Sequence, residues 1–140
     1  MPGAGAVNKL LMSGALLAAL AGCAAEPVKL QKERSYVLEW IGERPLMDYS
    51  HLTLTLADDG RAYGNAGCNH WFAQYSLQGH HLSFGTIGST RKLCVPALME
   101  QEKRFLEALA KVERWDISPI EQVRFWPADG KPLRFWPEEG

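Results

Sequence analysis

A group of cysteines and histidines in the middle of the sequence has side chains that commonly bind transition metals. They are Cys68, His70, His80, His81 and Cys94. Thiolate and imidazole groups build tetrahedral zinc sites, so such a site could be assembled from them. Their spacing matches no common zinc pattern, however, and two adjacent histidines in a polar turn cannot both point at one ion. We therefore expect no metal and no other cofactor, and interpret the histidines as surface residues.

Residue patterns typical of hydrolases are not found in the sequence. A serine nucleophile commonly lies in a Gly-x-Ser-x-Gly turn, and Gly88-Ser89-Thr90 lacks the second glycine. Glu100 and Glu102 are two residues apart on a predicted helix, so their carboxyl groups do not share a helix face. We expect no catalytic residue, and the protein is not expected to be an enzyme.

Residues 1–22 have the pattern of an export signal. Lys9 supplies a positive charge, and residues 10–21 form an uncharged apolar run of about a dozen residues, too short to span a membrane. The run ends in Leu-Ala-Gly-Cys, which resembles the lipobox of bacterial lipoproteins and implies a diacylglyceryl group on Cys23. A plain secretory signal and a short buried helix with an incidental cysteine are the alternatives.

This resemblance divides the chain into three parts and predicts its location. Residues 1–22 are removed, residues 23–34 form a lipidated tether without a periodic apolar pattern, and residues 35–140 form the domain. Several acyl chains together anchor a protein stably. Ala24 stands where an aspartate usually retains lipoproteins in the inner membrane. We therefore expect a bacterial envelope protein held in outer-membrane lipid through Cys23, with its domain facing the periplasm.

Export into an oxidising compartment determines how the remaining cysteines are interpreted. Once Cys23 is acylated, Cys68 and Cys94 are left, and paired thiols persist as disulfides in such a compartment. A bridge between them would add about 3 kcal/mol of stability, mainly by restricting the unfolded chain. The alternative is a redox or nucleophilic cysteine, for which a Cys-x-x-Cys motif is missing.

The composition is that of one globular domain. Hydrophobic residues make up 46% of the chain and charged residues 22%, which excludes a disordered protein. The formal net charge is -1, and the leader contains one of the 15 basic residues and none of the 16 acidic ones. A nearly neutral body offers no basic stripe for nucleic acid and little charge attraction to anionic lipid. We expect a monomer with no nucleic-acid partner.

Most of the domain is predicted to form short β-strands. Between residues 51 and 56, leucines alternate with histidine and threonine, the pattern of a half-buried strand, and Asp58-Asp59-Gly60 is a hairpin turn signal. Further strands are predicted at residues 36–41, 61–65, 71–77, 81–84 and 114–117.

One segment has helical spacing instead, and the chain then closes with a local repeat. Residues 96–112 place Phe105 and Leu109 on one helix face, with Pro96 at the favoured first position. The repeat is Arg-Phe-Trp-Pro, beginning at Arg124 and again at Arg134. It predicts a hairpin whose two phenylalanines oppose each other on the inner face.

The tryptophans of this repeat are predicted to lie on the outer face beneath arginines. A register that places Arg124 opposite Arg134 is disfavoured, because like charges would then face each other. The tryptophans could alternatively close the mouth of a barrel that holds an apolar ligand.

Two separated blocks followed by a helix resemble the META domain of HslJ-like bacterial proteins. The first block is Gly-Asn-Ala-Gly-Cys-Asn at residues 64–69, and the second is Thr-Arg-Lys-Leu-Cys at residues 90–94. Lys92 stands where methionine is commoner, and Tyr36 where tryptophan is more usual. The residues that match the family motif are Gly64, Gly67, Cys68, Asn69, Tyr75, Thr90, Arg91, Cys94 and Glu102.

The resemblance implies an α+β fold that is mainly β. It is an antiparallel, partly open β-barrel, lipocalin-like or secretin-pilot-like, with one packed α-helix. Family members are linked to heat or antibiotic stress, and no enzymatic reaction is established for them.

Two functions are therefore open. One is a non-catalytic envelope protein that binds an envelope protein not named by the sequence, or gives structural support under stress. The other is a small carrier that binds an acyl chain or other apolar ligand in its barrel. Arg91 and Lys92 are either a small anion-binding patch or the solvated end of a strand.

Overall fold

The computed structural model describes residues 27–139. The predicted export signal, the predicted acylation site at Cys23 and the first residues of the predicted tether lie outside this range. No helix in the described part of the chain is long and apolar enough to cross a membrane.

The described residues form ten β-strands and one α-helix. In chain order they are β1 (Ser35–Ile41), β2 (Arg44–Pro45), β3 (Thr53–Leu56), β4 (Arg61–Asn65), β5 (His70–Gln78), β6 (His81–Phe84), β7 (Gly88–Ser89), α1 (Pro96–Ala110), β8 (Val112–Ile117), β9 (Val123–Pro127) and β10 (Leu133–Pro137). The strands predicted from the sequence are all present, with bounds that shift by two residues or fewer.

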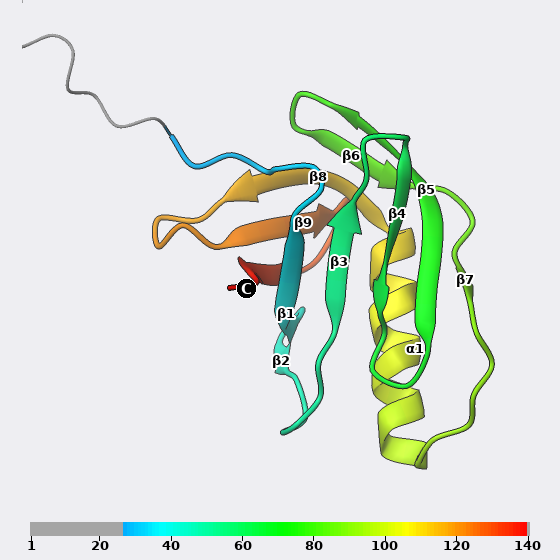
Figure 1. Ribbon diagram of the computed structural model, residues 1–140. Coiled ribbons are helices and arrows are strands. Elements are labelled where there is room, and N and C mark those ends of the chain that lie inside the picture. The colour runs from blue at the N-terminus through cyan, green and yellow to red at the C-terminus, as the bar shows by residue number, and fades with distance from the viewer. Residues whose placement is uncertain (1–26, 140) are drawn as a thin grey trace, which may run out of the picture.

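Eight of these strands form a closed antiparallel barrel (Figure 1). The order is β10-β9-β8-β6-β5-β4-β3-β1, and β1 pairs with β10 to complete the circuit. The expected antiparallel barrel with one helix is confirmed. The shortest seam lies between β6 and β8, which share one ladder pair, His81 with Arg114. The helix and β7 are inserted between these two strands in the chain.

The barrel interior is filled by side chains that alternate along the strands. Trp71 of β5 is 1% exposed, and its ring meets those of Phe84 and Phe105 edge-on, at centroid distances of 6.1 and 6.0 Å. Eight strands enclose a space that side chains can fill completely. The interior is therefore a packed core. The helix α1 contributes Phe105 and Leu109 to this core.

The helix ends two residues earlier than its spacing predicts. Pro96 occupies the first turn as expected, but the last helical residue is Ala110, and Val112 already begins β8. Val112 is 3% exposed, so it does join the core, from a strand. The helical spacing of apolar residues extended to Val112 because the last buried residue of the helix, Leu109, is three positions before the first buried residue of β8, Val112.

The closing hairpin has a different register from the predicted one. Phe125 lies opposite Leu133, and Arg124 lies opposite Arg134, which is the register that like charges were expected to disfavour. Phe125 and Phe135 do point inward, 1% and 0% exposed, so the predicted faces are right and the predicted partners are wrong.

A third strand explains why the two arginines can oppose each other. Arg124 donates two hydrogen bonds to the carboxyl group of Asp116 on β8, each 2.7 Å long. This bidentate pair offsets the repulsion between Arg124 and Arg134. Val123 and Leu133 also lie on the inner face, 1% and 2% exposed.

The segment before β1 is bound to the barrel. The backbone N–H of Glu33 donates to the carbonyl of Leu56 at 2.8 Å, and that of Gln31 donates to the Tyr36 hydroxyl at 2.9 Å. Contact with the barrel thus begins ahead of residue 35.

Candidate functional site

The most interconnected group of polar side chains is centred on Asn69, in the turn between β4 and β5. Asn69 is 4% exposed. Its amide oxygen accepts hydrogen bonds from the Lys92 backbone N–H (2.6 Å) and the Thr90 hydroxyl (2.9 Å). Its amide nitrogen donates to the Lys92 carbonyl at 3.0 Å. One buried side chain therefore fixes the segment that leads from β7 to the helix.

Glu102 joins this group from the helix. It is 4% exposed, and its two carboxyl oxygens accept hydrogen bonds from the backbone N–H of Asn69 (3.0 Å) and from the Asn69 side-chain amide (3.1 Å). Every polar atom of the Asn69 side chain thus has a partner. Buried polar groups stabilise a fold only when they are paired in this way. We call Asn69, Thr90, Lys92 and Glu102 the Asn69 cluster.

A disulfide bond closes the same region. Cys68 and Cys94 are joined, with Cα atoms 6.0 Å apart, as expected from the sequence. The bridge links the residue before Asn69 to the residue two positions after Lys92. Covalent and hydrogen-bonded links therefore hold the same two segments together. Neither thiol is left for redox chemistry or metal binding while the bond is intact.

The two motif glycines are required by their backbone surroundings. A Cβ atom at Gly64 would lie 2.0 Å from the carbonyl oxygen of Thr53, which also accepts a hydrogen bond from the Trp71 indole. Gly67 has φ +107°, a conformation that favours glycine. Gly64 allows β3 and β4 to approach closely, and Gly67 allows the tight turn that presents Asn69.

Two further motif residues lie outside the Asn69 cluster. The Tyr75 hydroxyl donates to the Ala57 carbonyl at 2.5 Å and so fastens β5 to the end of β3. Burial, with the nearby carboxylates of Asp58, Asp59 and Glu33, raises the pKa of Tyr75, which keeps this donor protonated. Arg91 is exposed and lies beside the cluster without belonging to it.

A groove of about 620 Å³ runs between the segment after β7 and the helix. One wall is formed by residues 89–93. The other wall is formed by Met99, Lys103, Leu106 and Glu107 of α1, and Asn69 and Glu102 form the floor. The motif residues thus lie beneath a groove and hold one of its walls in place.

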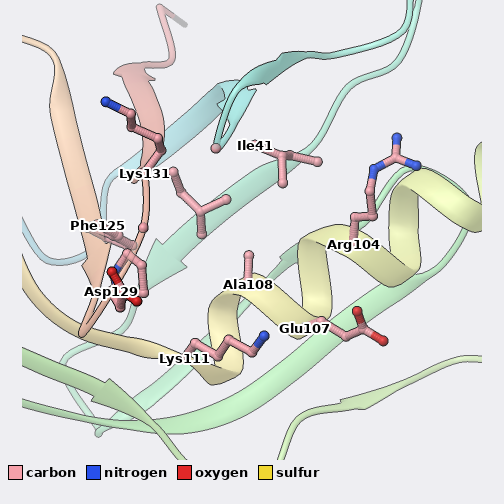
Figure 2. A pocket seen from close by; sticks show the side chains of 12 residues that line it. Ile41, Arg104, Glu107, Ala108, Lys111, Phe125, Asp129 and Lys131 are labelled. Carbon is pink, nitrogen blue, oxygen red and sulfur yellow. The ribbon is translucent and has the colours of Figure 1, made fainter.

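A second hollow, of about 230 Å³, lies at one mouth of the barrel beside α1 (Figure 2). Ile41 and Lys131 line it on one side, and the helix residues Arg104, Ala108 and Lys111 line it on the other (Figure 2). Its deepest walls are apolar, and its rim has charges of both signs.

The two tryptophans of the repeat lie on the outer face of the barrel. Trp126 is covered by Arg114, whose guanidinium carbon is 4.6 Å from the ring centroid, and by Arg124 at 5.2 Å. Trp136 instead donates its indole N–H to the carboxyl group of Glu39. The predicted outer position is confirmed for both tryptophans. The predicted register placed Arg134 over Trp126 and Arg124 over Trp136, and these partners are wrong: Arg114 and Arg124 cover Trp126, and Trp136 is bonded to Glu39. Neither tryptophan lines the hollow at the barrel mouth.

Asp116 is an acidic residue that the sequence analysis did not single out. Burial alone would raise its pKa, but hydrogen bonds from Arg124 and Trp126, together with the charges of Arg124 and Arg114, outweigh burial and lower the pKa. Asp116 is therefore a structural anion between β8 and β9. The only sequence signal for this role is that Arg114 and Asp116 are two residues apart in a predicted strand, so that opposite charges lie on the same face.

The histidines considered for metal binding are spread over the surface. His70, His80 and His81 are all exposed, as expected for surface residues. His80 lies at the β6–β8 seam, with its ring 4.7 Å from that of Trp115. Within residues 27–139, no group of three or more histidine, cysteine or acidic side chains has the geometry to hold a metal ion.

Comparison with known proteins gives a family and two similar structures. The sequence matches the META domain family over residues 28–140. An NMR structure of a protein from Burkholderia xenovorans is 26% identical and superposes with a TM-score of 0.66, covering 84% of this chain and 97% of that one. A second protein solved by NMR is 21% identical, with a TM-score of 0.58 and coverages of 74% and 88%, and shows the same fold. No curated protein matches the sequence.

Proposed function

Because this chain belongs to the META domain family, we propose that it is a non-catalytic bacterial envelope protein, anchored by lipid on Cys23, which acts by binding another envelope protein. Through this binding, the protein would support the envelope under heat or antibiotic stress. The domain is proposed to face the periplasm from the outer membrane.

The observation that carries a non-catalytic role is that the buried Asn69 and Glu102 side chains bond to each other and to the backbone. Catalytic groups need a free lone pair or a transferable proton facing a substrate. Here both carboxyl oxygens of Glu102 accept bonds from Asn69, and the Asn69 amide is itself fully bonded. The motif residues are therefore occupied in holding the fold together, which supports a role in presenting a surface.

The anchor is supported by where the domain begins. The segment bound to the barrel starts near Gln31, so few residues separate it from Cys23. A short tether keeps the domain close to the membrane surface. The disulfide supports the same proposal, because such bonds persist in the periplasm.

The mass of the protein extracted from bacterial membranes tests this proposal. We expect the chain to begin at residue 23 with a diacylglyceryl group on Cys23 and to partition into detergent. Cys23→Ser should lose both properties. The matched control is the double variant Cys68→Ser and Cys94→Ser, which removes two cysteines and should remain lipidated. A wild-type protein with a free amine at residue 23, found in the soluble fraction, would contradict the proposal.

The hollow at the barrel mouth favours a second candidate, the acyl carrier. Its apolar walls, which include Ile41, Phe125 and Leu133, suit a hydrocarbon chain, and Lys131 at the rim suits an anionic head group. Its volume of about 230 Å³ is small beside the roughly 300–1,000 Å³ of ordinary ligand sites. Native mass spectrometry decides: one lipid retained per chain, in addition to the anchor, would put the carrier ahead.

A further inference from the structure

Residues 89–93, at the end of β7 and just after it, have a free edge along the groove. β7 is the short strand that pairs with β5. The backbone N–H of Thr90 donates to the carbonyl of His70 at 3.0 Å, so residue 90 is directed toward β5. Along an antiparallel strand, successive residues direct their backbone groups to opposite sides. The N–H and carbonyl groups of Ser89 and Arg91 are therefore directed away from β5, toward α1.

This edge has no strand beside it in the part of the chain that the structure describes. β7 pairs with β5 alone, and α1 forms the far wall of the groove. An unpaired edge of this kind takes up an added strand when the space beside it is open. The groove of about 620 Å³ is that space.

The edge is also fixed in position before anything binds. Asn69 holds the backbone of Lys92 through two hydrogen bonds, and the Cys68–Cys94 bond holds the segment two residues further on. A strand that is already ordered loses little entropy when a second strand is added. The motif residues thus preorganise a short strand edge that the barrel does not itself use.

The charge around the groove selects the occupant. Arg91 and Lys92 are exposed, and within residues 27–139 neither has a carboxylate within 4.0 Å. Lys103 on the opposite wall has only a long contact with Glu107, at 4.0 Å. Leu93, Met99 and Leu106 add apolar surface to the walls, and the buried carboxyl group of Glu102 lies at the floor. The exposed part of the groove therefore has three positive charges, those of Arg91, Lys92 and Lys103, and one negative charge, that of Glu107, beside an apolar surface.

We infer that this groove binds an extended, acidic polypeptide segment of a partner protein, which adds to the free edge of residues 89–93 as an antiparallel or parallel strand. The inference rests on the proposed function, since it identifies the surface through which an envelope partner is bound. A strand alternates its side chains between two faces. Arg91 and Lys92 are consecutive and so lie on opposite faces of the edge. The segment that fits therefore has acidic residues at every second position, on the face of Arg91, and apolar residues between them.

A model peptide tests the inference. The probe is an eight-residue, end-blocked peptide that alternates Glu and Val, labelled with fluorescein and titrated with the full chain in detergent while its anisotropy is recorded. We expect saturable binding, and slower hydrogen exchange at the Ser89 and Arg91 amides. The same peptide with Lys in place of Glu should not bind.

Two N-methylated peptides separate strand pairing from simple charge attraction. One is methylated at the backbone nitrogen of each Glu and the other at that of each Val. Only one edge of an added strand faces residues 89–93, so one of the two peptides should lose binding and the other should keep it. If both bind as well as the parent peptide, or the parent does not bind at all, the inference is wrong.

A pair of charge-reversal variants locates the binding. Arg91→Glu should weaken the parent peptide roughly tenfold, because one favourable contact becomes a repulsion. Arg44→Glu makes the same charge change on β2, away from the groove, and should leave binding unchanged. Equal weakening by both variants would overturn the inference. Acylation and membrane fractionation of Arg91→Glu test the proposed function separately, because neither depends on the groove.

Discussion

At the scale of single residues, Asn69 connects more parts of the molecule than any of the residues that the sequence analysis considered for metal binding or catalysis. It joins the β4–β5 turn to the segment after β7 and, through Glu102, to the helix. Removing a side chain with several buried partners leaves those partners unpaired, and that loss is larger than the worth of any single bond.

Asn69→Ala should therefore lower the free energy of unfolding by about 3 kcal/mol, because one oxygen of the buried Glu102 carboxyl group and the backbone N–H of Lys92 lose their hydrogen bonds with the Asn69 side chain. Urea unfolding followed by tryptophan fluorescence measures it. The matched control is Asn65→Ala, whose side chain accepts one bond, from Gly67 N–H, and should cost about 1 kcal/mol. A cost for Asn69→Ala no greater than the control's would contradict the role given to the Asn69 cluster.

Gly64 gives a second prediction at this scale. Gly64→Ala would place a methyl group 2.0 Å from the Thr53 carbonyl oxygen, so β3 and β4 would have to separate, at a cost of about 3 kcal/mol or more. Gly85→Ala is the control, because its new Cβ meets no atom closer than 3.6 Å and should change stability by less than about 0.5 kcal/mol. Thermal unfolding of both variants checks the difference.

The sequence identified these residues only through their resemblance to a family motif. Composition and spacing did not reveal that Glu102 is buried. Glu100, two residues earlier on the same helix, is the same residue type and is exposed, so the residue type alone does not distinguish them. The helix buries Gln101 and Glu102 as well as Phe105, so its inner face is not an uninterrupted apolar stripe. Which polar residue turns inward depends on Asn69, a partner more than thirty positions away in the chain.

At the scale of elements, the closing hairpin shows where local patterns stop being sufficient. Alternation along β9 and β10 correctly placed Phe125 and Phe135 inside. It could not give the register, because both registers put the same residues on the inner face. The choice depended on Asp116 of β8, a neighbour that a two-strand argument leaves out.

Asp116 makes the hairpin sensitive to acid. Its pKa in the folded protein lies below the value of about 3.9 expected in the unfolded chain, so the stability it contributes is complete above about pH 4 and is lost as the pH falls through the folded pKa. Asp116→Asn should cost about 1–3 kcal/mol at pH 7. The difference from wild type should shrink between about pH 4 and pH 2. Unfolding at several pH values measures it, and a constant difference would exclude this role.

At the scale of the whole molecule, pairing of β1 with β10 leaves neither of these two long strands with an exposed edge. Local signals in residues 35–41 and 133–137 predict two strands but not that they are neighbours, since nothing in either pattern names a partner nearly a hundred residues away. The resemblance implied an antiparallel, partly open barrel, and the pairing of β1 with β10 closes it.

Removing β10 should reverse this protection. Deleting residues 133–140 exposes the edges of β1 and β9 and uncovers Phe125, so the protein should form oligomers or aggregates. Deleting only residues 139 and 140 leaves β10 intact and should give the monomer expected for the full domain. Size-exclusion chromatography in detergent compares the two. A monomeric, folded protein lacking β10 would show that the closure is dispensable.

The β1–β10 ladder also means that the order of the strands around the barrel has no natural beginning. The backbone N–H of Glu138 donates to the carbonyl of Ser35 at 2.8 Å, so the two ends of the barrel chain are in direct contact. A circularly permuted gene should therefore encode the same fold: a short linker would join residue 139 to residue 31, and new ends would open in the β9–β10 turn at Gly130, at the other end of the barrel. In such a protein the lipid anchor could be moved to the opposite side of the barrel, which would change the surface that faces the membrane while every strand kept its neighbours.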